Sequence, residues 1–319
     1  MTARLAIIIV SWNVRDLLRE CLAAVARSEG LVAEAVETIV IDNASSDDSA
    51  AMVRAEFPAV RLIESGANLG FAKGCQLGYD WTSAPVVMLL NPDTVVDPDA
   101  IAAMLDTIEG DPGIGILGSR LRNSDGSFQR ASGGAFPTLR NLAWNYLFLG
   151  RLLPRRWAPP PVYLDDDPPG IRSIDWVSGA SLTLRRAAVG PVIFHPAFFM
   201  FGEDMELCHR VGQAGWRVLY SARQSITHHH GASFARQSSL EILASVYQGP
   251  RLFFRQGRGP LARAAYDAIL FAGYAVRWAA FGLLGTLRRN PDHRAMARFC
   301  RRYLMVMAAS ILERREARR

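Results

Sequence analysis

Short apolar runs alternate with segments of helical periodicity along the first 120 residues, and this alternation limits the chain to an α/β fold. Five runs have the length and composition of buried strands: 5–10, 38–41, 60–63, 86–90 and 114–117. The segments between them have the spacing and end signals of helices: 15–28, 46–57, 70–81 and 98–109. Strands joined by helical crossovers lie parallel, so we expect a Rossmann-like, mostly parallel sheet with helices on both faces.

Two carboxylates directly follow predicted strands. Asp42 comes after the run 38–41, and Asp93 follows the run 86–90 within the turn Asn91-Pro92-Asp93. Because ligands of open α/β sheets bind outside the carboxyl ends of the strands, both side chains should face one crevice. A carboxylate at such a position is well placed to hold a divalent metal on a phosphorylated ligand. Either turn alone could be purely structural, but the two together favour a ligand site.

A second group of acids follows the aromatic run 198–201. Glu203 and Asp204 come directly after it, and apolar surroundings raise the pKa of a carboxyl group, which suits a general base. The alternative is the common enrichment of acids at a helix N-terminus, here that of a predicted helix over 204–214. His228 begins a run of three histidines, of which only one or two can enter a site as metal or phosphate ligands.

The pattern changes in the second half of the chain. Glycine, proline and aspartate dominate residues 122–175, which predicts loops, and strand-like runs follow at 181–184 and 217–220. Beyond Ser233 the chain becomes helical and apolar. We therefore expect an α/β domain over residues 1–235 and a helical extension over residues 236–319.

The extension is strongly basic. Residues 1–250 carry 21 basic and 26 acidic side chains, whereas residues 251–319 carry 15 and 4. The segment 268–287 is long enough to span a bilayer, but its one charge, Arg277, would cost about 2.5–3.5 kcal/mol at the centre of a span. We expect helices that lie on an anionic membrane surface. The alternative is a buried helical hairpin packed on the α/β domain.

The cysteines and the N-terminus indicate a cytoplasmic setting. Four cysteines are scattered without a Cys-x-x-Cys pair, as is typical of reduced thiols: Cys21, Cys75, Cys208 and Cys300. The N-terminal apolar run 5–10 is too short for a signal peptide. The expected location is the cytoplasm, peripheral on the inner face of the cell membrane.

Seven short motifs occur in a fixed order, and together they resemble family 2 glycosyltransferases of GT-A fold, especially the bacterial rhamnosyltransferase-like members. The resemblance covers roughly residues 4–235. The motifs are Val10-Ser-Trp-Asn13, Asp42-Asn-Ala-Ser-Ser46, Asn68-Leu-Gly-Phe71, Asn91-Pro-Asp93, Val177-Ser-Gly-Ala180, Gly202-Glu-Asp204, and His228 with Gly231 and Ser233.

The resemblance implies a role for individual residues of these motifs. Donor-binding residues would be Ser11, Asn13, Asp42, Asn68, Gly70, Asn91 and Asp93. Gly179 and Ala180 would lie on the acceptor side. Asp204 would be the catalytic base with Glu203 in support, and Asp93 and His228 would hold Mg²⁺ or Mn²⁺. Asn91 replaces the first acid of the family's usual Asp-x-Asp motif, so only Asp93 is an anionic ligand there.

The implied reaction is inverting transfer of a sugar, with rhamnose as the leading candidate, from a dTDP- or UDP-sugar. The acceptor would be a hydroxyl of a polyprenyl-linked saccharide in cell-envelope polysaccharide synthesis. One alternative is a sugar-nucleotide-forming nucleotidyltransferase, although residues 11–16 lack the glycine-rich loop such enzymes use. Another is a non-enzymatic nucleic-acid- or membrane-binding module, but the tail is too apolar for a nucleic-acid-binding arm, so we expect no nucleic-acid partner. The motif 113–118 matches a nicotinamide-dinucleotide fingerprint but follows a helix, so it fails on context.

Overall fold

The computed structural model describes residues 3–31, 35–229 and 240–316, and the chain divides into two compact units. The first unit comprises residues 1–136 and 163–236, and the second comprises residues 137–162 and 237–319. Residues 137–162 thus belong with the C-terminal helices although they precede residue 235. The division of the chain at that residue into functional domains stays a prediction.

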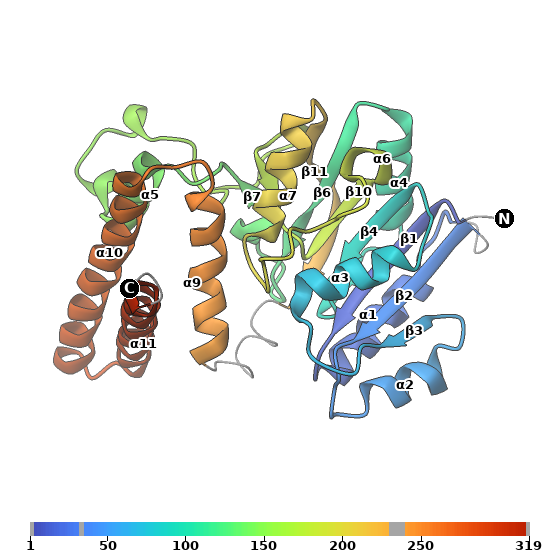
Figure 1. The fold of residues 1–319 in the computed structure, drawn as a ribbon, viewed down its shortest axis with the longest axis horizontal. Coiled ribbons are helices and arrows are strands. Elements are labelled where there is room, and N and C mark those ends of the chain that lie inside the picture. Colours follow the sequence, from blue (N-terminus) through green and yellow to red (C-terminus); the bar gives the residue numbers. More distant parts are fainter. Residues whose placement is uncertain (1–2, 32–34, 230–239, 317–319) are drawn as a thin grey trace. The chain divides into compact units, whose positions relative to one another are not determined.

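One sheet forms the centre of the first unit (Figure 1). Among the described residues its strands are β1 (Leu5–Ser11), β2 (Val36–Asp42), β3 (Arg61–Glu64), β4 (Val86–Leu90), β5 (Thr94–Val96), β6 (Ile114–Arg122), β8 (Ile171–Ser173), β10 (Ser181–Arg185) and β11 (Arg217–His228). Their order is β3-β2-β1-β4-β10-β6-β11-β5, and β8 pairs with β11. The strands β1 to β4 are mutually parallel, as are β6 and β11, whereas β10 runs antiparallel between β4 and β6. The predicted mostly parallel sheet is confirmed.

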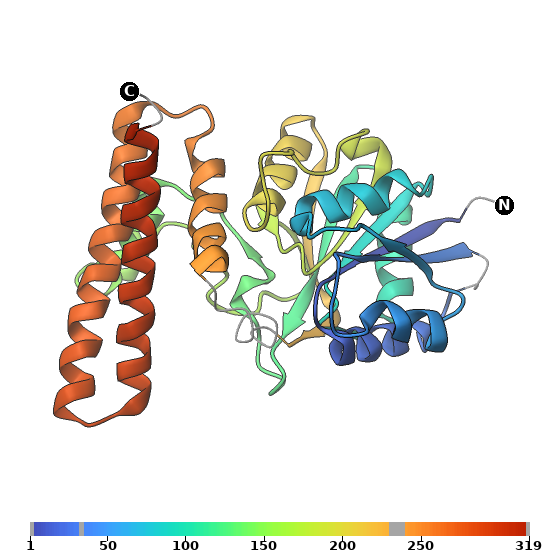
Figure 2. The same cartoon turned by 60° about the horizontal axis from the view of Figure 1, so that its bottom comes forward.

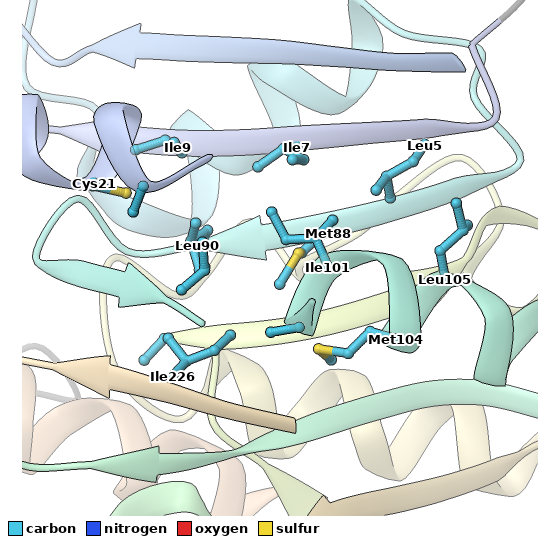
Figure 3. Packing of buried hydrophobic residues seen from close by; sticks show 14 of the residues in the cluster. Leu5, Ile7, Ile9, Cys21, Met88, Leu90, Ile101, Met104, Leu105 and Ile226 are labelled. Carbon is cyan, nitrogen blue, oxygen red and sulfur yellow. The ribbon is translucent and has the colours of Figure 1, made fainter. Parts of the chain in front are cut away.

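Helices cover both faces of the sheet, as predicted (Figure 2). Those of the first unit are α1 (Arg15–Ala26), α2 (Ser49–Glu56), α3 (Gly70–Asp80), α4 (Ala100–Gly110), α6 (Arg186–Val189) and α7 (Glu203–Gln213). Successive side chains of a strand point to opposite faces. Ile7 and Ile9 of β1 therefore join the core beneath α1 and α4, while Ile8 faces α3 on the other side. Figure 3 shows the first of these layers.

The short strand β5 escaped the sequence analysis, and it is important for the site. It begins directly after the turn at Asp93 and pairs antiparallel with the end of β11, with Thr94 opposite His228. Three residues are too few to show a periodic pattern. For the same reason the two-stranded sheet of β7 (Gly133–Gly134) and β9 (Trp176–Val177) was not predicted.

The second unit is helical. It contains α5 (Leu139–Tyr146), the short 3₁₀ turns η3 (Leu149–Arg151) and η4 (Arg155–Trp157), and the long helices α9 (Leu240–Arg255), α10 (Pro260–Leu287) and α11 (Pro291–Glu316). Arg251 of α9 makes two hydrogen bonds of 2.6 Å to the carboxylate of Asp267 in α10, which also accepts one from Tyr247. This buried group of hydrogen bonds joins the two helices. Within the described residues, α10 is the one helix long and apolar enough to cross a membrane.

Arg277 is not a free charge in the middle of α10. Its guanidinium donates to the carbonyl oxygens of Tyr146 and Asn145 at 2.9 and 3.2 Å, and lies 4.3 Å from the ring centre of Phe148. The last carbonyls of a helix have no partner within the helix, so Arg277 satisfies the C-terminal end of α5. The charge that we expected to oppose a membrane span of this segment therefore fastens α5 to α10.

Two glycines in matched positions test the packing of α3. Gly78 lies in the last turn of α3, where an added Cβ would come within 2.6 Å of Ile8; Gly212 lies in the last turn of α7 with open space around it. We expect Gly78→Ala to lower the free energy of unfolding by about 1–3 kcal/mol through overpacking. Gly212→Ala should raise it by up to about 1 kcal/mol through helix propensity. Urea denaturation measures both, and equal signs would contradict the close packing of α3 on β1.

Candidate active site

The predicted acids lie at one edge of the sheet. Ser11 at the end of β1 is in register with Asp42 at the end of β2, and Leu90 at the end of β4 is in register with Ile9. The carboxyl ends of these three neighbouring parallel strands therefore meet at the same edge. Asp42 and the turn carrying Asp93 both follow at that edge, as the sequence predicts.

Asp42 and Ser11 present buried polar atoms without partners. The Oδ2 atom of Asp42 accepts a hydrogen bond from the backbone N–H of Ser45 at 3.0 Å, but Oδ1 has no hydrogen-bond partner among the described residues. The Oγ atom of Ser11 also lacks one. Both side chains are buried, and an unsatisfied buried polar group costs about 1–3 kcal/mol. Unpaired atoms on adjacent strand ends are what a site for a polar ligand requires.

Asn13 and Asn68 shape the loops around this point. Asn13 has a positive φ of 54°; its N–H donates to Ser45, and its Oδ1 accepts from the N–H of Ser46 at 2.7 Å. The Oδ1 atom of Asn68 accepts from the N–H of Gly70 at 3.0 Å. Both amides are thus engaged with backbone, so their support of a ligand would be largely through the loops they hold.

Gly70 occupies a position that only glycine fits. Its φ is +78°, and an added Cβ would lie 2.5 Å from the ring of Phe199 and 2.8 Å from its carbonyl oxygen. That carbonyl accepts hydrogen bonds from the N–H groups of Phe71 and Ala72 at the start of α3. Asn43, which the sequence analysis did not single out, donates its side-chain amide to the carbonyl of Gly70 at 3.1 Å. The backbone thus approaches closely on both sides of this glycine.

Asp93 and His228 meet through the pairing of β5 with β11. The Nε2 atom of His228 lies 3.3 Å from Oδ1 of Asp93 and 3.4 Å from the side-chain nitrogen of Asn91, and both Asp93 and His228 are buried. In addition, the N–H of His229 donates to the carbonyl of Asp93 at 2.8 Å. The sequence placed these residues in one site, and the structure brings their side chains together.

Gln129 fixes the tautomer of His228. Its Oε1 lies 2.7 Å from Nδ1 of His228, while its Nε2 donates to Oδ1 of Asn123 at 2.9 Å. Because the amide nitrogen is used by Asn123, the oxygen accepts from Nδ1–H, so in the neutral imidazole Nε2 carries the lone pair. In that form, Nε2 and the Asp93 carboxylate are both suited to bind one cation. No motif marked Gln129.

Asp204 and Glu203 begin α7 in apolar surroundings. Burial raises the pKa of Asp204 to about 6, against the N–H groups of Gly179 and Met205, which donate to its carboxylate at 3.3 and 2.8 Å. Burial, reinforced by the neighbouring charge of Asp204, raises the pKa of Glu203 well above its usual range. Both pKa values are raised, and the stronger rise on Glu203 favours ionisation of the pair at Asp204.

Gly179 and Ala180 connect Asp204 to the turn at Asn91–Asp93. The N–H of Gly179 donates to Asp204, and the carbonyl of the next residue, Ala180, accepts from the N–H of Asn91 at 2.9 Å. An added Cβ on Gly179 would lie 3.3 Å from the ring of Phe71. The base candidate, the Asn91–Asp93 turn and the start of α3 thus converge on this backbone segment. Gly231 and Ser233 of the last motif lie outside the described residues.

Comparison with known proteins identifies the class of enzyme to which this arrangement belongs. Residues 6–168 match glycosyl transferase family 2, and the chain belongs to this family. The resemblance found in the seven motifs is confirmed. The chain is a glycosyltransferase, which decides against the nucleotidyltransferase and the non-enzymatic module that the sequence left open.

The most informative relative is a mycobacterial enzyme. Over 266 residues the chain is 30% identical to the N-acetylglucosaminyl-diphospho-decaprenol L-rhamnosyltransferase of Mycobacterium tuberculosis, in strains CDC 1551 and H37Rv. The match covers 76% of this chain and 82% of the relative. The likeness to rhamnosyltransferases is therefore shown over most of both chains.

Solved structures share the fold. The mannosyltransferase PcManGT of Pyrobaculum calidifontis, in complex with GDP-Man and Mn²⁺, superposes with a TM-score of 0.60 at 16% identity. That likeness covers 98% of this chain and 88% of the other. GalNAc-T7 with UDP, GalNAc and Mn²⁺ gives a TM-score of 0.51 at 14% identity, covering 71% of this chain and 43% of that one. The predicted GT-A-like architecture is confirmed.

The raised pKa of Glu203 predicts a pH-dependent effect on stability. Its folded-state pKa lies above the unfolded value of about 4.3. The folded state therefore becomes less favoured as the pH rises from the unfolded pKa through the folded-state pKa. The Glu203→Gln variant has no carboxyl group at this position, so it should lack this pH-dependent loss of stability. We expect its melting temperature to exceed that of the wild type by a few degrees at pH 8, with the difference vanishing near pH 4. The exposed Glu29→Gln should show no difference, and identical melting of Glu203→Gln and wild type at pH 8 would contradict the raised pKa of Glu203.

Proposed function

We propose that this glycosyltransferase moves a sugar, rhamnose as the leading candidate, from a dTDP- or UDP-sugar to a hydroxyl of a polyprenyl-linked saccharide, with inversion. The observation that carries the proposal is the convergence of Asp42, Asp93 with His228, and Asp204 at one edge of the sheet. The name of the mycobacterial relative supports rhamnose and a polyprenyl diphosphate acceptor. Such a reaction belongs to cell-envelope polysaccharide synthesis.

The donor would lie along the carboxyl ends of β1, β2 and β4. The unpaired Oδ1 of Asp42 and Oγ of Ser11 are suited to hydrogen bonds from and to a nucleotide base. Asn13, Asn68 and Gly70 would shape the loops that enclose it. We assign the diphosphate to the neighbouring turn at Asn91 and Asp93, because a divalent cation held by Asp93 would neutralise its charge there.

The residues present fit a divalent cation. Asp93 and His228 lie 3.3 Å apart and would be the two ligands that the protein supplies. Among the described residues, no group of three or more His, Cys, Asp or Glu side chains could hold a metal. Mg²⁺ is commonly held by one or two carboxylates together with substrate phosphates, and Mn²⁺ takes the same oxygen ligands. When bound, Mg²⁺ or Mn²⁺ would neutralise charge on the leaving diphosphate. Both solved neighbours cited above contain Mn²⁺.

Asp204 would act as general base. Its carboxylate would take the proton from the acceptor hydroxyl as that oxygen attacks the anomeric carbon on the face opposite the leaving group. The raised pKa of Glu203 disfavours a second negative charge beside the attacking oxygen, so ionisation of the pair favours Asp204. Gly179 and Ala180, on the acceptor side, hold the base in place through the Gly179 N–H.

The second unit would hold the enzyme at the inner face of the cell membrane, near its lipid-linked acceptor. It carries 19 basic and 5 acidic side chains, while the first unit carries 17 and 25. Large apolar side chains are exposed along α10: Leu261, Phe271, Val276, Trp278, Leu283 and Leu287. Positive charge beside exposed apolar surface is typical of proteins that lie on anionic bilayers. The proposal keeps residues 1–235 as the catalytic domain and residues 236–319 as a membrane-associating extension, and includes no nucleic-acid partner.

Loss of the base should separate turnover from donor binding. Asp204→Asn removes the proton acceptor but keeps the shape of the side chain, so we expect turnover to fall about 10²–10⁴-fold with donor affinity unchanged. Glu203→Gln leaves the Asp204 carboxylate in place and should retain far more activity. In the wild type, kcat/KM should fall as the pH drops through about 6, because Asp204 is then protonated. Near-normal turnover of Asp204→Asn would remove this residue from the base role.

Donor class and metal are tested together by nucleotide-induced thermal shifts. We expect UDP or dTDP with Mn²⁺ to raise the melting temperature, and nicotinamide or adenine nucleotides to have no effect. Gln129→Leu frees the ring of His228, so the Mn²⁺ concentration needed for half of this shift should rise about 10–100-fold. Gln224→Leu is the matched control, since Gln224 is equally buried but bonds Ser221. An unchanged Mn²⁺ requirement in Gln129→Leu would contradict the role of His228, and no shift with either pyrimidine nucleotide would contradict the proposed donor.

A further inference from the structure

A segment from the middle of the chain contributes positive charge to the second unit. Residues 137–162 contain four arginines and no acidic side chain. Three of these arginines lie in residues 149–157, which form η3, a short linker and η4, and which we call the arginine loop. The same loop exposes Leu152, Leu153 and Trp157, with Leu152 79% exposed. Cationic and large apolar side chains thus alternate on one exposed segment.

The arginines of this loop are available to a partner. No salt bridge joins Arg151, Arg155 or Arg156 to an acid within the described parts of the chain. Arg151 and Arg156 instead stack on the rings of Phe148 and Trp157, with their guanidinium carbons 5.2 and 5.4 Å from the ring centres. Stacking leaves the N–H groups of a guanidinium free to bind oxygen atoms of an anion.

The loop is fastened at both ends to the helices of its unit. Arg140 of α5 donates to the carbonyl of Trp157 at 2.8 Å, and Asn141 donates to the carbonyl of Pro160 at 3.3 Å. On the other side, Arg277 of α10 binds the end of α5 and stacks on Phe148 at the start of the loop. The arginine loop is therefore continuous with α10, whose exposed apolar side chains we assigned to the membrane.

We propose that the arginine loop binds an anionic phospholipid surface. Arg151, Arg155 and Arg156 contact the lipid phosphates, while Leu152, Leu153 and Trp157 enter the boundary between headgroups and acyl chains. Tryptophan is enriched at that depth, and basic side chains near an anionic leaflet bind it electrostatically. The inference rests on the proposed membrane association of the second unit. It assigns part of that contact to residues that precede the C-terminal extension by about 80 positions.

Vesicle cosedimentation of the full chain tests the electrostatic part. The double variant Arg155→Gln, Arg156→Gln should bind vesicles of phosphatidylcholine with phosphatidylglycerol about 10- to 30-fold more weakly than the wild type, from about fivefold per arginine. The matched control is Arg27→Gln, Arg223→Gln, which removes from the first unit two exposed arginines that form no salt bridge with the described residues, and it should bind as the wild type does. Equal affinities of the two double variants would overturn the proposal.

A matched pair of tryptophans tests the apolar part. Trp157 and Trp81 are 49% and 54% exposed, and each lies beneath an arginine, Arg156 and Arg61 respectively. Trp157→Ala should weaken binding to the same vesicles severalfold, whereas Trp81→Ala should not, and equal loss in both would overturn the role of the loop. All variants should keep the thermal shift with UDP or dTDP, which monitors donor binding by the first unit. Failure of the wild type to bind these vesicles would overturn this inference and the membrane association together, but not the glycosyltransferase reaction.

Discussion

The reversal of the chain at Asn91–Asp93 is the constraint on which the active site depends. A buried parallel strand, β4, ends there, and within one turn the chain enters β5 and pairs with the far end of β11. That pairing sets Thr94 opposite His228 and brings the imidazole to 3.3 Å from the Asp93 carboxylate. The neighbouring carbonyl of Ala180 holds the same turn from the β10 side. The turn thus brings together a carboxylate and an imidazole that are 135 positions apart in the sequence.

Burial gives the two acidic groups different chemistry. Asp93 lies beside the imidazole of His228, and together they present ligand atoms to a cation. Burial of Asp204 and Glu203 raises the pKa of each carboxyl group, the more strongly for Glu203. In the proposed reaction, this edge of the sheet would hold a cation with phosphate at Asp93 and a base at Asp204, joined by a short backbone link.

Much of the fold was predictable because apolar runs directly indicate the buried strands of the sheet. The limits of β4 agree to the residue, and Asp42 and Asp93 were found because each follows a strand that is buried on both faces. The order of the seven motifs along the sequence placed Asp204 and His228 in the same predicted site. The sequence did not predict β5, whose three residues have no periodicity, or Gln129, whose role depends on a contact 99 positions away. Arg277 was interpreted from composition as a charge to be kept from lipid, and only its geometry shows that it holds the end of α5.

The carbonyl of Phe199 connects the start of α3 to the segment that precedes Asp204. It accepts the first free N–H groups of α3, and the ring of the same residue closes over Gly70. Asp204 follows five residues later on the same short stretch of chain. The start of α3 is therefore hydrogen-bonded to the segment that leads into Asp204. In the proposed reaction, the donor-side loop and the candidate base would share this backbone contact.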